Sequence, residues 1–224
     1  GAAMGEILRA ELAAHGFAGK LLLCGDHEIA LAGAMQTPGC VLIAGTGSIC
    51  YGKNAAGEHF RCGGGGHIID DPGSGYALGR DALAAALQTE DGRLSENALH
   101  GAVMDTVGGS GIQGIFDFVY FSRRGKGDIA ALAPLVLRCA AQGDAVSLDI
   151  LRRGAAELAR LVSAVMGKLG LENGSPCALA GGLLAEDNVY RRAVCAALAP
   201  FCRPAAPEHD ALFGAVQLAL AAIQ

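Results

Sequence analysis

The sequence predicts a fold of the α/β class, in which strands and helices are mixed along 224 residues. Two patterns support this prediction. Short apolar runs that end at glycine, such as residues 40–44 and 176–180, have the length and composition of buried strands. Between them, longer segments repeat apolar residues at helical spacing. Because both patterns recur along the whole chain, the class is α/β or α+β.

The composition limits the class of protein. A net charge of −5, with Lys and Arg scattered along the chain, gives no basic stripe of the kind that binds nucleic acid. No apolar run reaches the roughly 18–20 residues of a membrane span, and no signal peptide opens the chain. We therefore expect a cytoplasmic protein with small-molecule partners, without nucleic acid or membrane among them. The eight cysteines form no CxxC pair, so we expect small buried side chains in a reducing compartment.

The first third of the chain is expected to contain two helices and four strands. The expected elements are a helix over residues 4–15, a strand over 20–24, a helix over 28–34, and strands over 40–44, 48–53 and 58–62. The last three strands are expected to form a meander, because only short glycine-containing turns separate them.

Helices dominate from residue 76 onward. The expected elements are helices over 76–88, 129–142 and 144–169, a strand over 176–180, and helices over 187–198 and 211–223. Asp144 is expected to cap the long helix, because an Asp side chain accepts hydrogen bonds from the free N–H groups of the first turn. Gly214 falls in the last helix at a position where close packing needs no side chain.

The sharpest motif is Gly45-Thr46-Gly47-Ser48, which follows the strand 40–44. Glycine lets the backbone approach a ligand, and exposed N–H groups with the Thr and Ser hydroxyls can cradle phosphate oxygens. A plain hairpin turn explains the same residues. The motif is not a P-loop, since no Gly-Lys-Ser/Thr follows, and not a dinucleotide fingerprint, since a strand follows it instead of a helix.

Two further motifs also follow expected strands. Gly181-Gly182 follows strand 176–180, where bare backbone either holds a flat group or permits close packing. Asp26 follows strand 20–24, where α/β folds place catalytic groups, and a carboxylate there can accept a proton from a substrate hydroxyl. The alternative for Asp26 is an N-cap of helix 28–34.

Taken in order, these motifs resemble those of the N-acetylglucosamine kinase and BadF/BcrA-type ATPase family, in the actin, sugar-kinase and heat-shock-chaperone superfamily. The residues that carry the resemblance are Leu42 to Ser48, Tyr51-Gly52, Asn54, Gly63 to His67, Gly73 to Tyr76, Gly79-Arg80, Gly143-Asp144, Ala180 to Gly182 and Phe213 to Ala215. The resemblance implies a ribonuclease-H-like fold of two domains with a nucleotide cleft. It assigns residues 1–44 to the remainder of the N-terminal domain, 45–210 to the C-terminal kinase domain, and 211–224 to a helix that packs back on the N-terminal domain.

The resemblance also implies roles for individual residues, with ATP and Mg²⁺ as cofactors. It places the nucleotide on Gly45, Thr46, Gly47, Ser48, Gly181 and Gly182. It places the sugar on Thr46, Gly64, Gly65 and Asp71. Asp26 is the implied base that activates the sugar hydroxyl. No metal site built from side chains is expected, because Cys62, His67, Asp70 and Asp71 fit no zinc spacing.

Three departures from the family's pattern fall in the glycine-rich segment 63–76. Gly65 stands where the family has tryptophan, Asp70 where it has glycine, and Pro72 where it has glutamate. We expect Gly65 to leave space and thus a wider, less selective sugar pocket, and we expect His67 to brace the loop by a hydrogen bond to backbone. The family's first motif, Asp-Gly-Gly-Gly-Thr, has no match, so the first domain is expected to be incomplete.

The leading hypothesis is an ATP-dependent kinase that phosphorylates N-acetylglucosamine or a related amino sugar. One alternative is an activator-type ATPase that couples hydrolysis to electron transfer through an iron–sulfur cluster. Such activators carry a cysteine three residues before the phosphate-loop glycine, and this position is Leu42 here. A second alternative is a non-catalytic module that binds a sugar or nucleotide. The expected partners are these small molecules, and a homodimer is compatible with the resemblance.

Overall fold

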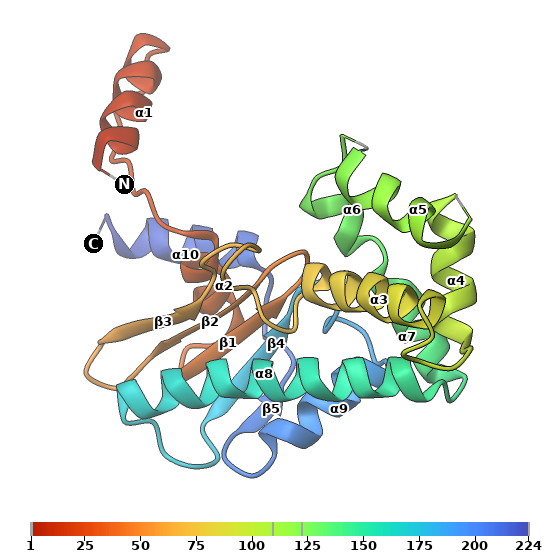
Figure 1. Cartoon of the computed structure of the whole chain (residues 1–224). Helices are drawn as coiled ribbons and strands as arrows, with labels where there is room; N and C mark the ends of the chain where they lie inside the picture. The colour runs from red at the N-terminus through yellow and green to blue at the C-terminus, as the bar shows by residue number, and fades with distance from the viewer. Residues whose placement is uncertain (1, 109, 122, 224) are drawn as a thin grey trace.

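A five-stranded mixed sheet forms the centre of the structure, a computed structural model that describes residues 2–108, 110–121 and 123–223. In spatial order the strands are β3 (His59–Gly63), β2 (Ser48–Lys53), β1 (Gly39–Ala44), β4 (Pro176–Ala180) and β5 (Arg203–Ala205). The first three form an antiparallel meander, whereas β4 and β5 run parallel to β1. The predicted α/β class and meander are confirmed, and β5 is an addition that the sequence patterns did not predict (Figure 1).

Helix α8 (Ala145–Leu169) crosses one face of the sheet and supplies much of the core (Figure 1). Its Leu158 and Val162 share one buried cluster with Leu42 and Cys50 of the sheet. Three more helices extend this cluster: α3 (Gly75–Glu90), α7 (Ala133–Ala141) and α9 (Val189–Leu198). The Asp144 side chain accepts a hydrogen bond from Ser147 N at 2.8 Å, which confirms the predicted cap of α8.

The opposite face of the sheet is covered by α2 (Asp26–Ala34), on which α10 (Ala211–Ala221) packs. The two helices meet at Gly33 and Gly214. A Cβ atom on Gly214 would lie 1.9 Å from Ile29 O, and one on Gly33 would lie 2.0 Å from Asp210 O. Because these backbones leave no room for a side chain, the expectation at Gly214 is confirmed.

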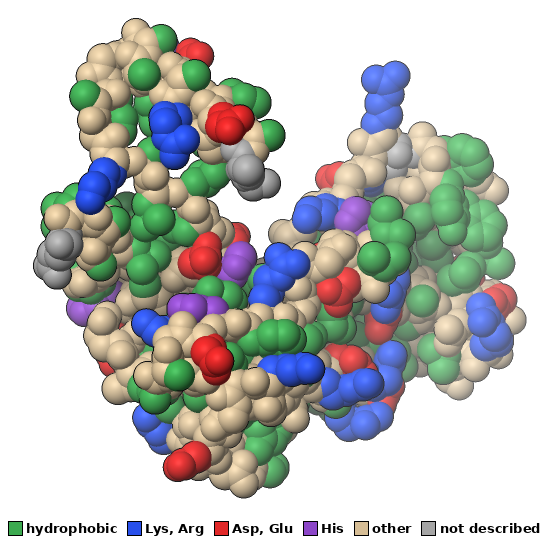
Figure 2. Space-filling view, turned by 90° about the vertical axis from the view of Figure 1, so that its left-hand side faces the viewer, with side chains coloured by type: hydrophobic (Ala, Val, Ile, Leu, Met, Phe, Trp, Pro, Cys, Tyr) green, Lys and Arg blue, Asp and Glu red, His purple; other side chains and the backbone are tan. Residues whose placement is uncertain are grey.

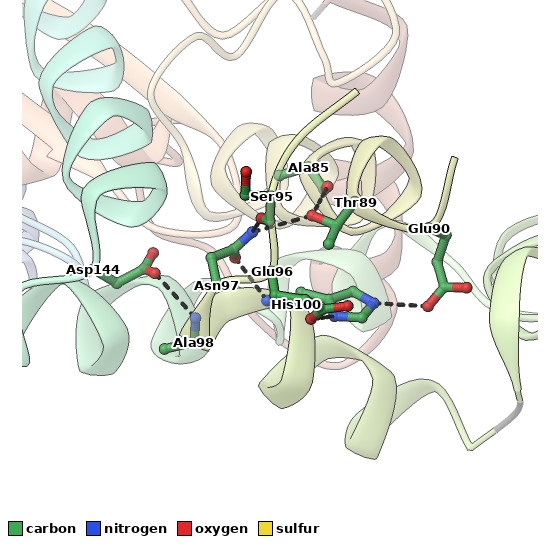
Figure 3. Close-up of polar contacts among 9 residues, drawn as sticks. All are labelled: Ala85, Thr89, Glu90, Ser95, Glu96, Asn97, Ala98, His100 and Asp144. Atoms are coloured by element: carbon green, nitrogen blue, oxygen red, sulfur yellow. Dashed lines mark hydrogen bonds and ion pairs between the residues drawn. The ribbon is translucent and has the colours of Figure 1, made fainter. Parts of the chain in front are cut away.

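Short helices form a lobe that lies along α3 (Figure 1). They are α4 (Ala98–Val107), α5 (Gly111–Phe116), a π-helix η1 (Asp117–Phe121) and α6 (Lys126–Ala130). His100 of α4 bonds to Glu90 at 2.7 Å and to Glu96 at 2.9 Å, and Asn97 caps α4 while donating to Thr89 (Figure 3). Burial acts to lower the pKa of His100, but the hydrogen bonds to both glutamates outweigh it, so this pKa is raised.

Two sequence predictions about elements are wrong. Residues 20–24 form no strand, and Leu22 and Leu23 are about half exposed, because a strand needs a paired neighbour and the described residues offer none there. The helix expected over 129–142 is two helices, α6 and α7, that break after Ala130; Pro134 lies in the first turn of α7, where its missing N–H costs no hydrogen bond.

Helix α1 (Ala2–Ala14) projects away from the sheet, and the two ends of the described chain lie on the same side of the molecule (Figure 1). Figure 2 shows this helix from the side as a separate lobe with hydrophobic side chains open to solvent. Met4 and Ile7, for example, are more than half exposed. The domain boundary expected at residue 44/45 falls in the turn between β1 and β2, and the division into domains stays a prediction.

Within residues 2–108, 110–121 and 123–223, no single helix has both the length and the apolar composition needed to cross a membrane. Two consecutive helical segments, Lys126–Ala141 and Ala145–Leu169, reach that length and composition only when they are taken together. The chain bends by 118° between them.

Candidate nucleotide and sugar site

Three of the predicted loops meet where β1 and β4 end. The loop 45–48 follows β1, and the loop 181–184 follows β4. The segment 64–74 lies against the loop 45–48 and leads into α3. Gly75 N donates to Gly45 O at 2.7 Å, and Leu183 N donates to Ala44 O at 3.1 Å. Because β1 and β4 are parallel neighbours, their carboxyl ends open at the same edge, where α/β sheets bind ligands.

The loop 45–48 exposes free backbone donors. Gly45 N donates to Gly47 O at 2.9 Å, which closes the turn, whereas the N–H groups of Thr46 and Gly47 have no partner among the residues that the structure describes. A Cβ atom on Gly45 or on Gly182 would have no heavy atom within 4 Å. Two adjacent unpaired N–H groups beside open space suit the oxygens of an anion, so these residues fit the phosphates of a nucleotide.

Asp71 joins the predicted sugar segment to this loop. It is buried, with only 4 % of its surface exposed, and its φ of 57° is in the left-handed region, which Asp tolerates better than most residues. Its Oδ1 accepts from Ser48 N at 3.2 Å, and Ser48 Oγ donates to Pro72 O at 2.7 Å. A Cβ on Gly47 would lie 2.9 Å from Asp71 Oδ2. The Asp71 carboxylate therefore lies directly against the loop 45–48.

The space expected at Gly65 is filled. Gly65 N donates to Asp70 Oδ2 at 2.8 Å, and Asp70 N donates to Gly66 O at 2.8 Å, so Asp70 closes a small loop. A Cβ atom on Gly65 would lie 2.7 Å from that same carboxylate oxygen. The expectation of a wider pocket at this point is wrong, because two departures from the family's pattern, Gly65 and Asp70, occupy one place together.

His67 braces the loop in a different way from the one expected. Its ring lies edge-on to the ring of Tyr76, with 4.7 Å between centroids, and the described residues give its side chain no hydrogen bond. A cavity of about 590 Å³ lies on the α3 and α8 side of this loop, bordered by Asp70, Arg80 and Arg153 among others. None of the predicted nucleotide or sugar residues lines it, although residues 67–70, 72 and 73 of the segment 64–74 do.

Asp26 is the first residue of α2, and its side chain is 96 % exposed. Its carboxylate bonds to His27, and no contact within the described chain joins it to the loops at 45–48 and 181–184. Its alternative role as an N-cap is wrong, because the cap position is Gly25, whose N–H donates to the Glu28 side chain. The structure thus leaves Asp26 accessible, and its catalytic role stays a prediction.

Most cysteines are buried, as expected. Cys40, Cys50, Cys139, Cys177 and Cys202 are buried, and Cys24, Cys62 and Cys195 are partly buried. Cys40 and Cys177 are paired positions of neighbouring strands beneath α8. Residues 2–108, 110–121 and 123–223 contain no group of three His, Cys, Asp or Glu side chains that could hold a metal ion.

The sequence profile of the BadF/BadG/BcrA/BcrD ATPase family matches residues 4–219. The N-acetylmuramic acid/N-acetylglucosamine kinase of Clostridium acetobutylicum is 41 % identical over 159 residues, which is 70 % of this chain and 52 % of that protein. The N-acetyl-D-glucosamine kinase of Dictyostelium discoideum is 31 % identical over 174 residues, 75 % of this chain and 53 % of that protein. The chain thus spans about half the length of the curated relatives that it matches.

Two crystal structures resemble this one. A candidate N-acetylglucosamine kinase from Chromobacterium violaceum superposes with a TM-score of 0.71 and 32 % identity, covering 88 % of this chain and 65 % of that chain. A second candidate N-acetylglucosamine kinase, from Porphyromonas gingivalis, has a TM-score of 0.63 at 19 % identity over 86 % of this chain and 62 % of that chain, which supports the fold alone. The mixed sheet and its helices are therefore those of an actin-like sugar-kinase fold.

Proposed function

Because the chain belongs to the BadF/BadG/BcrA/BcrD ATPase family, we propose that it acts as an ATP-dependent sugar kinase that phosphorylates N-acetylglucosamine or a related amino sugar. The observation that carries this proposal is the pair of unpaired N–H groups at Thr46 and Gly47, beside the open backbone of Gly182, at the ends of two parallel strands. Both curated relatives carry the names of sugar kinases.

Phosphoryl transfer requires the chain mainly to position the nucleotide and the sugar. The backbone of Gly45, Thr46, Gly47 and Ser48 would hold the phosphates of ATP, and Gly181 and Gly182 would border the adenosine. Thr46, Gly64, Gly65 and Asp71 would hold the sugar. Asp26 would accept the proton of one sugar hydroxyl, whose oxygen then attacks the γ-phosphorus and releases ADP.

We propose that the chain uses ATP as its complex with Mg²⁺. The described residues supply no cage of side chains for that ion. Mg²⁺ usually keeps several waters and binds through one or two carboxylates and the phosphates of a nucleotide, so it requires no such cage.

The activator alternative finds less support in the structure. A cluster shared between two subunits needs cysteines at the surface, yet Leu42 occupies the activator position and is fully buried. Cys40 and Cys50 lie in the core beneath α8.

The test is to incubate the full chain with Mg-ATP and a panel of amino sugars and to measure ADP, with nucleotide binding measured in parallel by calorimetry. We expect sugar-dependent ADP release, and we expect Asp26→Asn to abolish it while nucleotide affinity stays within about twofold. Binding without turnover would favour the non-catalytic module. Absence of both nucleotide binding and turnover would refute the proposal.

The remaining parts of the proposal concern partners and place. We propose that the chain binds a sugar and a nucleotide, and neither nucleic acid nor membrane, in the cytoplasm. A homodimer is compatible with this proposal, and light scattering on the purified chain measures the oligomeric state.

A further inference from the structure

Tyr190, in the first turn of α9, connects two of the loops from beneath the site. Its side chain is fully buried, and its hydroxyl donates to Gly73 O at 2.6 Å, across 117 residues of sequence. Burial raises the pKa of Tyr190, so the phenol keeps its proton and remains a donor at physiological pH.

Two glycines shape the space around this hydroxyl. Gly73 has a φ of 67°, and a Cβ there would lie 2.5 Å from Gly154 O and 2.9 Å from the Tyr190 oxygen. A Cβ on Gly154 of α8 would lie 2.7 Å from the same oxygen. The hydroxyl is thus held in close contact between α8 and the loop, so a displacement of Tyr190 must displace Gly73.

Gly73 lies just before the start of α3, whose first residues bind the predicted phosphate loop 45–48. Ser74 caps α3, and the next two N–H groups bind the loop: Gly75 N donates to Gly45 O at 2.7 Å, and Tyr76 N donates to Thr46 O at 3.2 Å. The position of Gly73 therefore fixes the position of the loop 45–48.

Tyr190 is anchored equally to the predicted adenosine loop. Asn188 Oδ1 accepts from Tyr190 N at 2.8 Å, and Asn188 Nδ2 donates to Leu183 O at 3.0 Å. Leu183 follows Gly182 directly and donates to Ala44 O. The Tyr190 and Asn188 side chains together thus connect the loop after β4 with the loop before α3.

We propose that Tyr190 is a positioning residue that couples nucleotide binding at Gly181–Gly182 to the geometry of the sugar and phosphate loops. The inference rests on the proposed function and extends it, because it assigns to α9 the connection between the two ligands. Coupling between two sites is reciprocal, so sugar binding strengthens nucleotide binding through this connection and the reverse also holds.

The mechanical link is tested without any ligand. In Tyr190→Phe, which removes only the hydroxyl, we expect the Gly75 and Tyr76 amides to exchange hydrogen about five- to tenfold faster than in the wild type. The amide of Leu42, in the middle of β1, should not change. Tyr120→Phe is the matched control, because Tyr120 is 73 % exposed. Unchanged exchange at Gly75 and Tyr76, or an increase confined to α9, would overturn the proposal.

The energetic link is tested by calorimetry of Mg-ADP with and without saturating N-acetylglucosamine. We expect the sugar to strengthen ADP binding about fivefold or more in the wild type and less than about twofold in Tyr190→Phe. Asn188→Ala, which removes the anchor on the adenosine side, should have the same effect. A variant that keeps the full wild-type enhancement contradicts the coupling. If the wild type binds neither ligand, the proposed function fails, and hydrogen exchange alone decides on the link.

Discussion

Replacing Gly214 with alanine should destabilise the protein, although alanine favours helix. The added Cβ would lie 1.9 Å from Ile29 O and 2.5 Å from Gly33 N, both backbone atoms of α2. No rotamer can relieve these contacts, so α10 must move away from α2. Forced overpacking costs about 3 kcal/mol at the upper end of the usual range. The gain in helix propensity returns about 1 kcal/mol.

The net loss is thus about 2 kcal/mol, which lowers Tm by roughly 4–8 °C in a domain of this size. Gly167→Ala is the matched control, since Gly167 lies inside α8, is exposed, and would place its Cβ with nothing within 4 Å. There the same substitution should stabilise the protein by about 0.5–1 kcal/mol.

Calorimetric or circular-dichroism melts of the two variants and the wild type measure both shifts. Both substitutions replace glycine with alanine inside a helix, so Tm shifts of opposite sign separate the effect of the α10–α2 contact from the intrinsic helix preference of alanine. A Gly214→Ala protein that melts at or above the wild-type temperature would refute the reasoning. A lower Tm in both variants would show that the expected gain in helix propensity from glycine to alanine is wrong.

Three further predictions concern the loops and the helical lobe. His100→Gln should lower Tm most at acidic pH. The pKa of His100 is raised in the folded protein, so its contribution to stability is complete below the unfolded pKa of about 6.5 and is lost as pH rises through the folded pKa. The Tm difference between wild type and variant should therefore shrink on titration to alkaline pH. Asp71→Ala leaves Ser48 N without its partner; it should cost about 1–3 kcal/mol in urea unfolding and weaken N-acetylglucosamine binding about tenfold, and unchanged sugar affinity would remove Asp71 from the sugar site. Gly65→Trp should destabilise by about 0.5–1.5 kcal/mol because the new side chain displaces the Asp70 carboxylate from Gly65 N, and combining it with Asp70→Gly should cost less than the sum of the two single substitutions; additive losses would contradict the shared space.

The features that the sequence predicted well are those fixed by near neighbours. Asp144 could be identified as a cap because its acceptor lies three residues from the N–H group it binds. The meander of β1 to β3 follows from apolar runs joined by short turns. The strand expected at residues 20–24 failed because strand formation depends on a partner, and apolar composition alone does not provide one.

The features that the sequence could not predict depend on distant pairs. Gly65 by itself suggests open space, and the sequence does not show that the Asp70 side chain, five residues later, folds back to fill that space. Tyr190 carried no signal in the sequence, since its partner Gly73 lies 117 residues earlier and a tyrosine in a helix does not by itself indicate a contact. Only the folded chain shows that this hydroxyl meets a backbone carbonyl of the predicted site.

The glycines show the same limit most directly, because one residue type serves two opposite purposes. Gly45 and Gly182 face open space, where bare backbone is available to a ligand. Gly181 has a φ of 87°, and its Cβ would lie 2.4 Å from Ala44 O, so it allows the end of β4 to approach the end of β1. Close packing is therefore confirmed at Gly181, and the flat ligand surface stays a prediction for the open backbone of Gly182. Packing at Gly181 brings the exposed backbone of Gly182 to the edge where the loop 45–48 opens, so Gly181 contributes to the candidate site by the close approach that places its neighbour.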